Sequence, residues 1–275
     1  MTARPATYAF DNALSIQWQR LRALEGLLDA GTIRHLEAVG VGAGARCLEA
    51  GAGGGSVAAW LCERVGPEGA VVATDLDTTV LRDLPHGNLE VRVHDVLADD
   101  LPEEAFDLVH LRLLLAWLGD PALALHRLVA ALRPGGVLVA EEMDFVSVVP
   151  DARLDDRRRS VFARVVGAHN AVLAARHTFD PAYGRRLAGD LADAGLVEVG
   201  SEGRVGTWRG GGPGGLVWRL TFEQLRDAMV ASGAVTARDV DEAIALCSDP
   251  ELAFLSQVTM AAWGRRPASP VVAGQ

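Results

Sequence analysis

The residues best suited to chemistry form a glycine cluster between a short apolar run and a helical segment. Residues 45–48 are mostly apolar, residues 51–56 read Gly-Ala-Gly-Gly-Gly-Ser, and residues 57–65 have a helical pattern. Glycine is needed where the backbone passes close to a ligand or takes a positive φ, and a helix start offers unpaired N–H groups. The pattern therefore predicts a nucleotide-binding turn.

The identity of that nucleotide is narrowed by what surrounds the turn. A phosphate-binding P-loop needs a lysine after its last glycine, whereas all 26 basic residues of this chain are arginine. The absence of lysine also excludes a Schiff-base lysine and pyridoxal chemistry. A dinucleotide fingerprint stays open, because Gly53 to Ala58 fits G-x-G-x-x-A and Asp75 follows about 20 residues later.

A carboxylate just before the turn shifts the balance between these ligands. Glu49 at a strand end would repel a pyrophosphate but suits a cationic ligand. Here the chain resembles the class I S-adenosylmethionine-dependent methyltransferases, whose first motif, acidic-x-G-x-G-x-G, is matched by Glu49, Gly51, Gly53 and Gly55. The resemblance implies that these residues bind S-adenosylmethionine, which carries a sulfonium and an ammonium group.

Further motifs follow in the order of that family. Residues 70–75 read as a buried strand ending in Asp75, the position that hydrogen-bonds ribose in either nucleotide family. Residues 89–95 form a third strand, and Asp95 matches the position that accepts from the adenine amino group. Residues 106–110 resemble the fourth-strand motif, and 132–136 the L-x-P-G-G turn into strand five. The resemblance covers residues 45–145 and adds these residues to the cofactor site: Leu76, His94, Val96, Leu111 and Arg112.

The first forty residues are expected to cap this site. Residues 14–28 carry one helical apolar stripe, and Thr32 is a candidate cap for a second short helix. Tyr8 and Arg20 resemble cap residues that close over the methionine end of the cofactor in related enzymes, where an arginine could hold its carboxylate.

Strand and helix signals predict an α/β fold, with a doubly wound, mostly parallel seven-stranded sheet. We expect an N-terminal helical cap over 1–40 and a Rossmann-like methyltransferase domain over 41–264. Within it, 151–182 form a helical lid insertion and 213–248 a helical insertion. Residues 196–208 are the predicted sixth strand, 210–215 a flexible turn, 253–263 an antiparallel last strand and 265–275 a disordered tail.

Methyl transfer is an in-line displacement at an already activated carbon, so the catalytic residue is weakly specified by sequence. Candidates follow strands four and five, where open α/β sheets bind ligands: His110 and Arg112, then Glu141, Glu142 and Asp144. Alternation lets at most one or two of the acids face the site, and we favour Glu142. The predicted lid adds His169, Asn170, His177 and Tyr183. The catalytic candidates are therefore His110, Glu142, His169 and Tyr183, although each also has a structural interpretation.

The composition limits the partners. The formal charge of −10 disfavours a phosphate-backbone partner, so a small-molecule substrate is expected rather than nucleic acid. Cys47, Cys62 and Cys247 suggest neither disulfides nor zinc, and we predict no metal. No apolar run reaches the ~18 residues of a membrane span and no leader pattern is present, which predicts a cytoplasmic protein without a membrane partner. A homodimer is compatible with the sequence.

The acceptor stays open at this level. The strand-four motif of enzymes that methylate amino groups of nucleic acids is missing, as is the Asp-Asn pair of catechol-type enzymes. The arginine-only, alanine-rich composition resembles methyltransferases of high-GC bacteria that act on secondary metabolites. Aromatic residues leave room for a planar acceptor such as an indole or phenol: Phe145, Phe162, Phe179, Tyr183 and Trp208. The acceptor atom, oxygen, nitrogen or carbon, is not indicated.

Two alternative functions remain. One is a nicotinamide-dependent oxidoreductase, although the chain lacks the Tyr-x-x-x-Lys pair of the short-chain form of that class. The other is a non-catalytic S-adenosylmethionine-binding protein.

Overall fold

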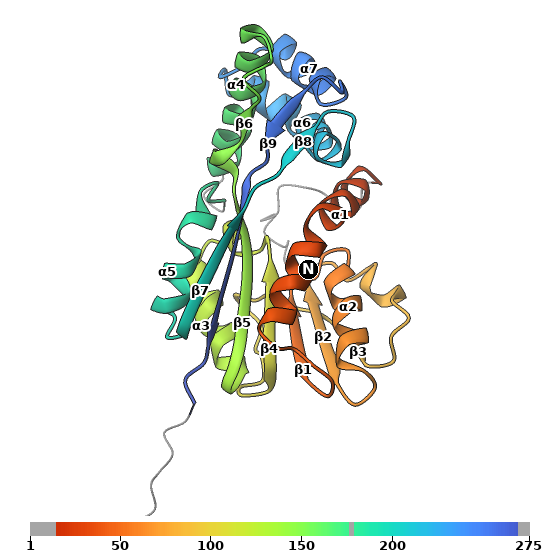
Figure 1. Cartoon of the computed structure of the whole chain (residues 1–275), viewed down its shortest axis with the longest axis vertical. Coiled ribbons are helices and arrows are strands. Elements are labelled where there is room, and N and C mark those ends of the chain that lie inside the picture. The colour runs from red at the N-terminus through yellow and green to blue at the C-terminus, as the bar shows by residue number, and fades with distance from the viewer. Residues whose placement is uncertain (1–14, 176–178, 269–275) are drawn as a thin grey trace, which may run out of the picture.

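A computed structural model describes residues 15–175 and 179–268. Its centre is a seven-stranded sheet of order β3-β2-β1-β4-β5-β10-β7, in which β10 runs antiparallel to both of its neighbours (Figure 1). The strands are β1 (Arg46–Ala50), β2 (Ala70–Asp75), β3 (Leu89–Val93), β4 (Phe106–Arg112), β5 (Leu132–Asp144), β7 (Val197–Arg204) and β10 (Val258–Arg265). The predicted mostly parallel sheet with an antiparallel last strand is confirmed.

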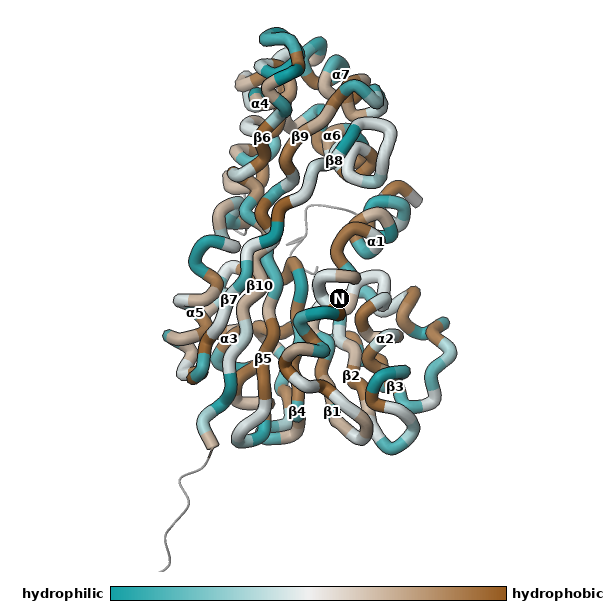
Figure 2. Tube along the Cα trace, viewed as in Figure 1, coloured by the Kyte–Doolittle hydropathy of each residue, from teal (hydrophilic) through white to brown (hydrophobic). Residues whose placement is uncertain are grey.

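Helices cover both faces of the sheet because the strands are apolar on both sides. Helices α1 (Ser15–Ala38) and α2 (Ser56–Val65) pack on one face, where Leu36 and Leu61 meet Cys47 and Val139. Helices α3 (Pro121–Ala131) and α5 (Leu187–Asp193) pack on the other face against residues such as Leu138. Short 3-10 turns lie at Leu81–Asp83, Leu115–Trp117, Phe145–Ser147 and Tyr183–Arg185. Figure 2 shows the apolar residues concentrated along the central strands.

A second layer of structure stands beyond the carboxyl ends of the central strands (Figure 1). It contains α4 (Asp156–Ala174), α6 (Pro213–Ala231), α7 (Ala237–Leu246) and a small sheet of order β6-β9-β8. The small sheet consists of β6 (Val149–Pro150), β8 (Thr207–Arg209) and β9 (Ala253–Leu255), paired antiparallel. Helix α6 also contacts α1, so the second layer lies over both the sheet and the first helix.

Two predicted strands are each divided between the central sheet and the small sheet. The predicted strand over 196–208 is two strands, β7 and β8, and the predicted last strand over 253–263 is β9 and β10. Each pair is consecutive in sequence but belongs to different sheets. A single apolar run cannot reveal this division, because both halves satisfy a strand pattern and only the partners differ.

The amino-terminal and glycine-rich predictions also change. Residues 15–38 form one continuous helix, so Thr32 caps no second helix, and its hydroxyl instead donates to Glu141. Helix α6 begins at Pro213, inside the predicted flexible turn. Gly214 is required there because a Cβ would lie 2.5 Å from the Trp208 ring. Glycine marks close helix packing at this point rather than flexibility.

The predicted tail begins too early. Arg265 is the last residue of β10, and the Arg266 backbone N–H donates to the Gly136 carbonyl at 2.9 Å. Residues 269–275 lie outside the described part of the chain. Within the described ranges, every helix is too short or too polar to cross a membrane.

Candidate functional site: two adjoining cavities at the strand ends

A first cavity lies at the carboxyl ends of β1 and β2, the position at which open α/β sheets bind ligands. Seven of the residues predicted to bind cofactor line it: Gly51, Gly53, Asp75, Leu76, His94, Asp95 and Val96. Its outer wall is apolar and comes from Leu21 of α1 and from the segment after β4, including Leu113, Leu114 and Trp117. The cavity therefore combines a polar floor with an apolar cover.

The glycine turn forms the floor of this cavity. Gly51 and Gly53 have φ values of 70° and 53°, in the left-handed region that favours glycine. A Cβ on Gly53 would meet no atom within 4 Å, whereas one on Gly51 would lie 3.2 Å from Leu114. Gly53 thus leaves its side of the cavity open, as a ligand passing close to the backbone requires.

Asp75 links the turn to the end of β2. Its Oδ2 accepts the Gly53 backbone N–H at 2.9 Å, and its Oδ1 accepts the Asp77 N–H at 3.1 Å. Burial raises the pKa of Asp75, while these backbone hydrogen bonds oppose that rise. Because a carboxylate has about four lone-pair sites, each oxygen can still accept from a ligand hydroxyl.

The adjoining polar residues come from the loop after β3. Asp95 lines the cavity, and its Oδ1 accepts the Leu97 backbone N–H at 2.9 Å. His94 is 9% exposed, and its Nε2 has no hydrogen-bond partner within the described ranges. This unpartnered ring nitrogen and the open side of Gly53 are what a polar heterocyclic ligand would need.

Glu49 does not line the cavity. Its Oε2 lies 2.6 Å from Nδ1 of His110, and both side chains are buried beneath the turn. The two residues pair in register on β1 and β4, which places their side chains on the same face of the sheet. Glu49 was predicted to face a cationic ligand, but its carboxylate is directed at a histidine of this chain and not into the first cavity.

Leu111, Gly55 and Arg112, which were also predicted to bind cofactor, do not line the first cavity. Leu111 is a fully buried core residue, and Gly55 lies against Leu81 and Leu84 at the start of α2. Arg112 is bound to α1, with Nη1 at 2.9 Å from both Asp29 Oδ1 and Thr32 Oγ1. Tyr8 and His177 lie outside the described residues.

The N-terminus of α2 is faced by acidic side chains of α1. Oε1 of Glu25 accepts the Ser56 backbone N–H at 3.4 Å, and the Ser56 hydroxyl donates to Asp29 Oδ1 at 3.1 Å. In dinucleotide-binding folds this helix end binds the pyrophosphate. Here two carboxylates stand near that position and would repel an anion.

A second cavity lies between α1, α4 and α6 and shares Leu113 and Trp117 with the first. Its apolar wall includes Leu24, Met143, Phe145 and Trp218, and its polar residues are Arg20, His169, Thr221 and Gln257. Arg20 was predicted to hold the cofactor carboxylate, but the structure places it in this second cavity beside His169. Of the four catalytic candidates, His169 is the one that lines either cavity.

The other candidates point elsewhere. Glu142 is fully buried, and its Oε1 accepts the Leu115 backbone N–H at 2.6 Å. Burial raises the pKa of Glu142 to about 8. Tyr183 is also buried, on the α5 side of the sheet, and burial raises the pKa of its hydroxyl. Side chains alternate along β5, so Met143 faces the cavity and Glu142 faces the opposite side.

Leu113 is the residue that sequence reasoning missed most clearly. It has φ 56°, an unfavourable value for a branched side chain, and its N–H donates to the Glu141 carbonyl at 2.8 Å. Strained residues of this kind concentrate at ligand sites. No residue-type pattern indicates this backbone conformation, so it could not be predicted from the sequence.

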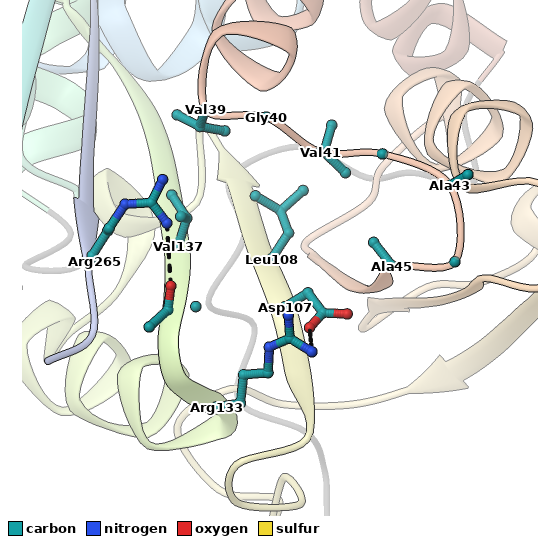
Figure 3. A pocket seen from close by; sticks show the side chains of 14 residues that line it. Val39, Gly40, Val41, Ala43, Ala45, Asp107, Leu108, Arg133, Val137 and Arg265 are labelled. Carbon is teal, nitrogen blue, oxygen red and sulfur yellow. Dashed lines mark hydrogen bonds and ion pairs between the residues drawn. The ribbon is translucent and has the colours of Figure 1, made fainter. Parts of the chain in front are cut away.

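A larger cavity, of about 360 Å³, lies at the opposite end of the sheet (Figure 3). Its walls come from Val39 to Ala45 and from the amino ends of β4 and β5. Its charged groups have partners, because Arg133 pairs with Asp107 and Arg265 donates to the Gly135 carbonyl at 3.2 Å. Size alone therefore does not mark the functional site.

Comparisons with known proteins agree with this geometry. Residues 48–140 match the methyltransferase domain family. The protein "Methyltransferase str3" of Strobilurus tenacellus is 28% identical over 185 residues, which cover 66% of this chain and 64% of that protein. The matched part thus spans less than two thirds of this relative.

Two solved structures share the fold. One is described as a methyltransferase of Bacillus halodurans C-125, with a TM-score of 0.54, 19% identity, and coverage of 86% of this chain and 98% of that one. The other is Haemonchus contortus phosphoethanolamine N-methyltransferase 2, in complex with phosphomonomethylethanolamine and S-adenosylhomocysteine. It has a TM-score of 0.52, 13% identity, and coverage of 94% of this chain and 62% of that one. Residues 48–140 are thus a methyltransferase domain, within a sheet of the class I methyltransferase fold.

Proposed function

We propose that the protein is an S-adenosylmethionine-dependent methyltransferase that methylates a small molecule of secondary metabolism. The observation that carries the proposal is the first cavity, whose floor is the Gly51–Gly53 turn held by Asp75. The methyltransferase match over 48–140 and the S-adenosylhomocysteine bound by the Haemonchus enzyme support the choice of cofactor. When bound, S-adenosylmethionine supplies a methyl group on a positively charged sulfur.

The residues of the cavity fit that cofactor. Asp75 would accept from the ribose hydroxyls, while Asp95 and the unpartnered His94 Nε2 lie where the adenine is expected. Leu76, Val96 and Leu118 would cover the apolar faces of the base. The formal charge of −10 makes a nucleic-acid acceptor unfavourable, because a phosphate backbone would be repelled.

The nicotinamide alternative is disfavoured by the start of α2. A dinucleotide would place its pyrophosphate where Glu25 and Asp29 already face the helix N-terminus. Glu49 does not add to this preference, because its carboxylate is buried against His110.

The test is a calorimetric titration of the purified protein with S-adenosylmethionine, S-adenosylhomocysteine, NADH and NADPH. We expect the first two to bind with micromolar dissociation constants and the nicotinamides to give no signal. Binding of a nicotinamide alone would overturn the proposal. A bound cofactor would justify an acceptor screen by mass spectrometry, in which a product gains one methyl group, and failure of every acceptor would favour a non-catalytic cofactor-binding protein.

A further inference from the structure

The second cavity contains a histidine whose tautomer is fixed by its neighbours. Nδ2 of Asn170 donates to the Phe145 carbonyl oxygen at 3.1 Å, which orients the amide and leaves Oδ1 as its free acceptor. That oxygen lies 2.9 Å from Nδ1 of His169. Nδ1 must therefore carry the proton, and Nε2 presents a lone pair.

The ring that carries this lone pair is packed against aromatic side chains. His169 is 2% exposed, and its ring packs edge-on against Trp218 at 5.2 Å between centroids. Phe145 lies on another side, at 6.2 Å. Both aromatic residues line the cavity, together with Leu24 and Met143. The cavity holds about 50 Å³, so its surroundings favour a small apolar group that carries a hydrogen-bond donor directed at Nε2.

Burial keeps this histidine neutral. It lowers the pKa of His169 to about 4, and the nearby Arg20 guanidinium lowers it further, against the opposing hydrogen bond to Asn170. Arg20 is the charged group that also lines the cavity, and Gln257 adds a second buried acceptor, Oε1, which has no hydrogen-bond partner within the described ranges. A ligand in the second cavity therefore meets two acceptors, Nε2 of His169 and Oε1 of Gln257, and the guanidinium of Arg20.

We propose that the second cavity binds a neutral hydroxyl compound and that Nε2 of His169 accepts the hydroxyl proton during O-methylation. The O–H bond breaks and its proton moves to Nε2. An electron pair of the oxygen forms the bond to the methyl carbon, and the electrons of the broken C–S bond stay on the leaving sulfur. The inference rests on the proposed function, and it selects oxygen over nitrogen and carbon as the acceptor atom.

Arg20 supports the choice of oxygen. As its proton leaves, a hydroxyl group develops negative charge, which a nearby guanidinium stabilises. The adjoining walls formed by Leu113 and Trp117 place this cavity directly beside the cofactor cavity.

The test uses phenol as the probe, with anisole and aniline as matched molecules, titrated into the protein saturated with S-adenosylhomocysteine. Anisole lacks the O–H and aniline replaces it with N–H donors. We expect phenol to bind at least about tenfold more tightly than anisole, and more tightly than aniline, because a buried acceptor is left unsatisfied by anisole. The S-adenosylhomocysteine titration itself tests the proposed function separately.

Two substitutions of His169 separate the contribution of the Nε2 lone pair to phenol binding from that of the packing of the ring. His169→Asn keeps a donor at the Nδ1 position but removes the acceptor, and should abolish the preference for phenol. His169→Gln places an oxygen near the Nε2 position, so it should retain phenol binding while losing base catalysis. His126→Asn, at an exposed position on α3, is the control and should bind phenol as the native protein does.

Nitrogen NMR of the imidazole ring provides a readout that does not depend on turnover. We expect the His169 ring to carry its proton on Nδ1 at neutral pH. A proton on Nε2, equal binding of phenol and anisole, tighter binding of aniline than of phenol, or an unchanged preference in His169→Asn would each overturn the inference. Bound S-adenosylhomocysteine without any phenol binding would overturn it too, while leaving the proposed function standing.

Discussion

Glu25 of α1 accepts the backbone N–H of Ser56 at 3.4 Å, and so places a carboxylate at the first turn of the helix that follows the glycine turn. Burial raises the pKa of Glu25, an effect that the hydrogen bond from Ser56 opposes. The contact joins the amino-terminal helix to the nucleotide turn. It also gives the N-terminus of α2 a negative partner from within the chain.

The contact between Glu25 and Ser56 connects the position of α1 with the kind of ligand that the glycine turn accepts. A Cβ on Gly54 would lie 2.2 Å from Glu25 Oε1, so the helix rests directly on the turn. An anionic cofactor would have to displace the acid, whereas a ligand with positive charge would not. The amino-terminal helix therefore contributes to the specificity of the turn as well as covering it.

The first prediction concerns Asp75. Asp75→Ala should weaken the binding of S-adenosylhomocysteine by about 1.5–3 kcal/mol, the usual loss for a hydrogen bond to a charged group. The variant also loses the contacts with the Gly53 and Asp77 backbone N–H groups, so the turn becomes less ordered. Calorimetry measures the change, and Asp100→Asn, at an exposed position, is the control. Unchanged affinity in Asp75→Ala would show that the turn does not bind the ribose.

Local patterns were sufficient for the parallel strands of the central sheet. The runs that form β1, β2 and β4 are short and mostly apolar, and glycine or an acidic residue marks the ends of β1 and β2. The small sheet could not be predicted, because β8 follows β7 without a strong break in the strand pattern, and β9 precedes β10 in the same way. Their separation depends on pairing with distant strands, which a local sequence pattern does not specify.

The cofactor cavity was more predictable than the second cavity. Gly53, Asp75 and Asp95 have roles set by backbone shape and strand ends, which sequence spacing reports. Glu142 is the acid that the sequence analysis favours, yet the alternation of side chains along β5 turns it away from the cavity. The position of Arg20 depends on how α1 packs on the second layer, and no local signal reports such packing.

The second prediction concerns a buried acid beneath α1. Nδ1 of His35 lies 2.6 Å from Glu141 Oε1, and Thr32 donates to the same carboxylate. Burial alone would raise the pKa of Glu141, but these hydrogen bonds and the nearby His110 and Arg112 hold it below its ordinary value. Glu141→Gln should therefore lower the free energy of unfolding at pH 7 by about 2–3 kcal/mol.

The pH dependence of that variant follows from the sign of the shift. An acid with a lowered pKa in the folded state stabilises the fold above its unfolded pKa, and loses that contribution as pH falls through the folded value. Urea denaturation should therefore show a large gap between native protein and Glu141→Gln at pH 7 and a smaller gap near pH 3. Exposed Glu63→Gln is the control. A gap that does not change with pH would contradict this interpretation.

The third prediction has the opposite sign and concerns Glu142. Its pKa is raised from 4.5 to about 8, so between these values the folded protein binds a proton that the unfolded chain does not. Stability from this group is complete below about pH 4.5 and is lost as pH rises toward 8. Glu142→Gln keeps an acceptor for the Leu115 N–H and cannot ionise, so it should be more stable than the native protein by about 1–3 kcal/mol at pH 8.5.

Urea denaturation between pH 5 and pH 8.5 measures this effect. The advantage of Glu142→Gln should grow across the range, while exposed Glu68→Gln should show no such trend. A variant less stable than the native protein at pH 8.5 would show instead that the ionised carboxylate is the form that the Leu115 and Ala116 N–H groups stabilise.

The fourth prediction concerns the titration of His169. Because burial lowers its pKa to about 4, the ring should stay neutral from pH 8 down to about pH 5 in the folded protein. In urea the same ring should titrate near 6.5, the ordinary value for histidine. The unfolded chain therefore binds more protons between pH 4 and 6.5, so this group adds stability above pH 6.5 that is lost as pH falls toward 4. Proton and nitrogen NMR, with His169→Asn to assign the signal, follows the ring directly. A His169 signal that titrates near 6.5 in the folded protein would show that water reaches the ring freely, and a base kept neutral by burial would then be ruled out.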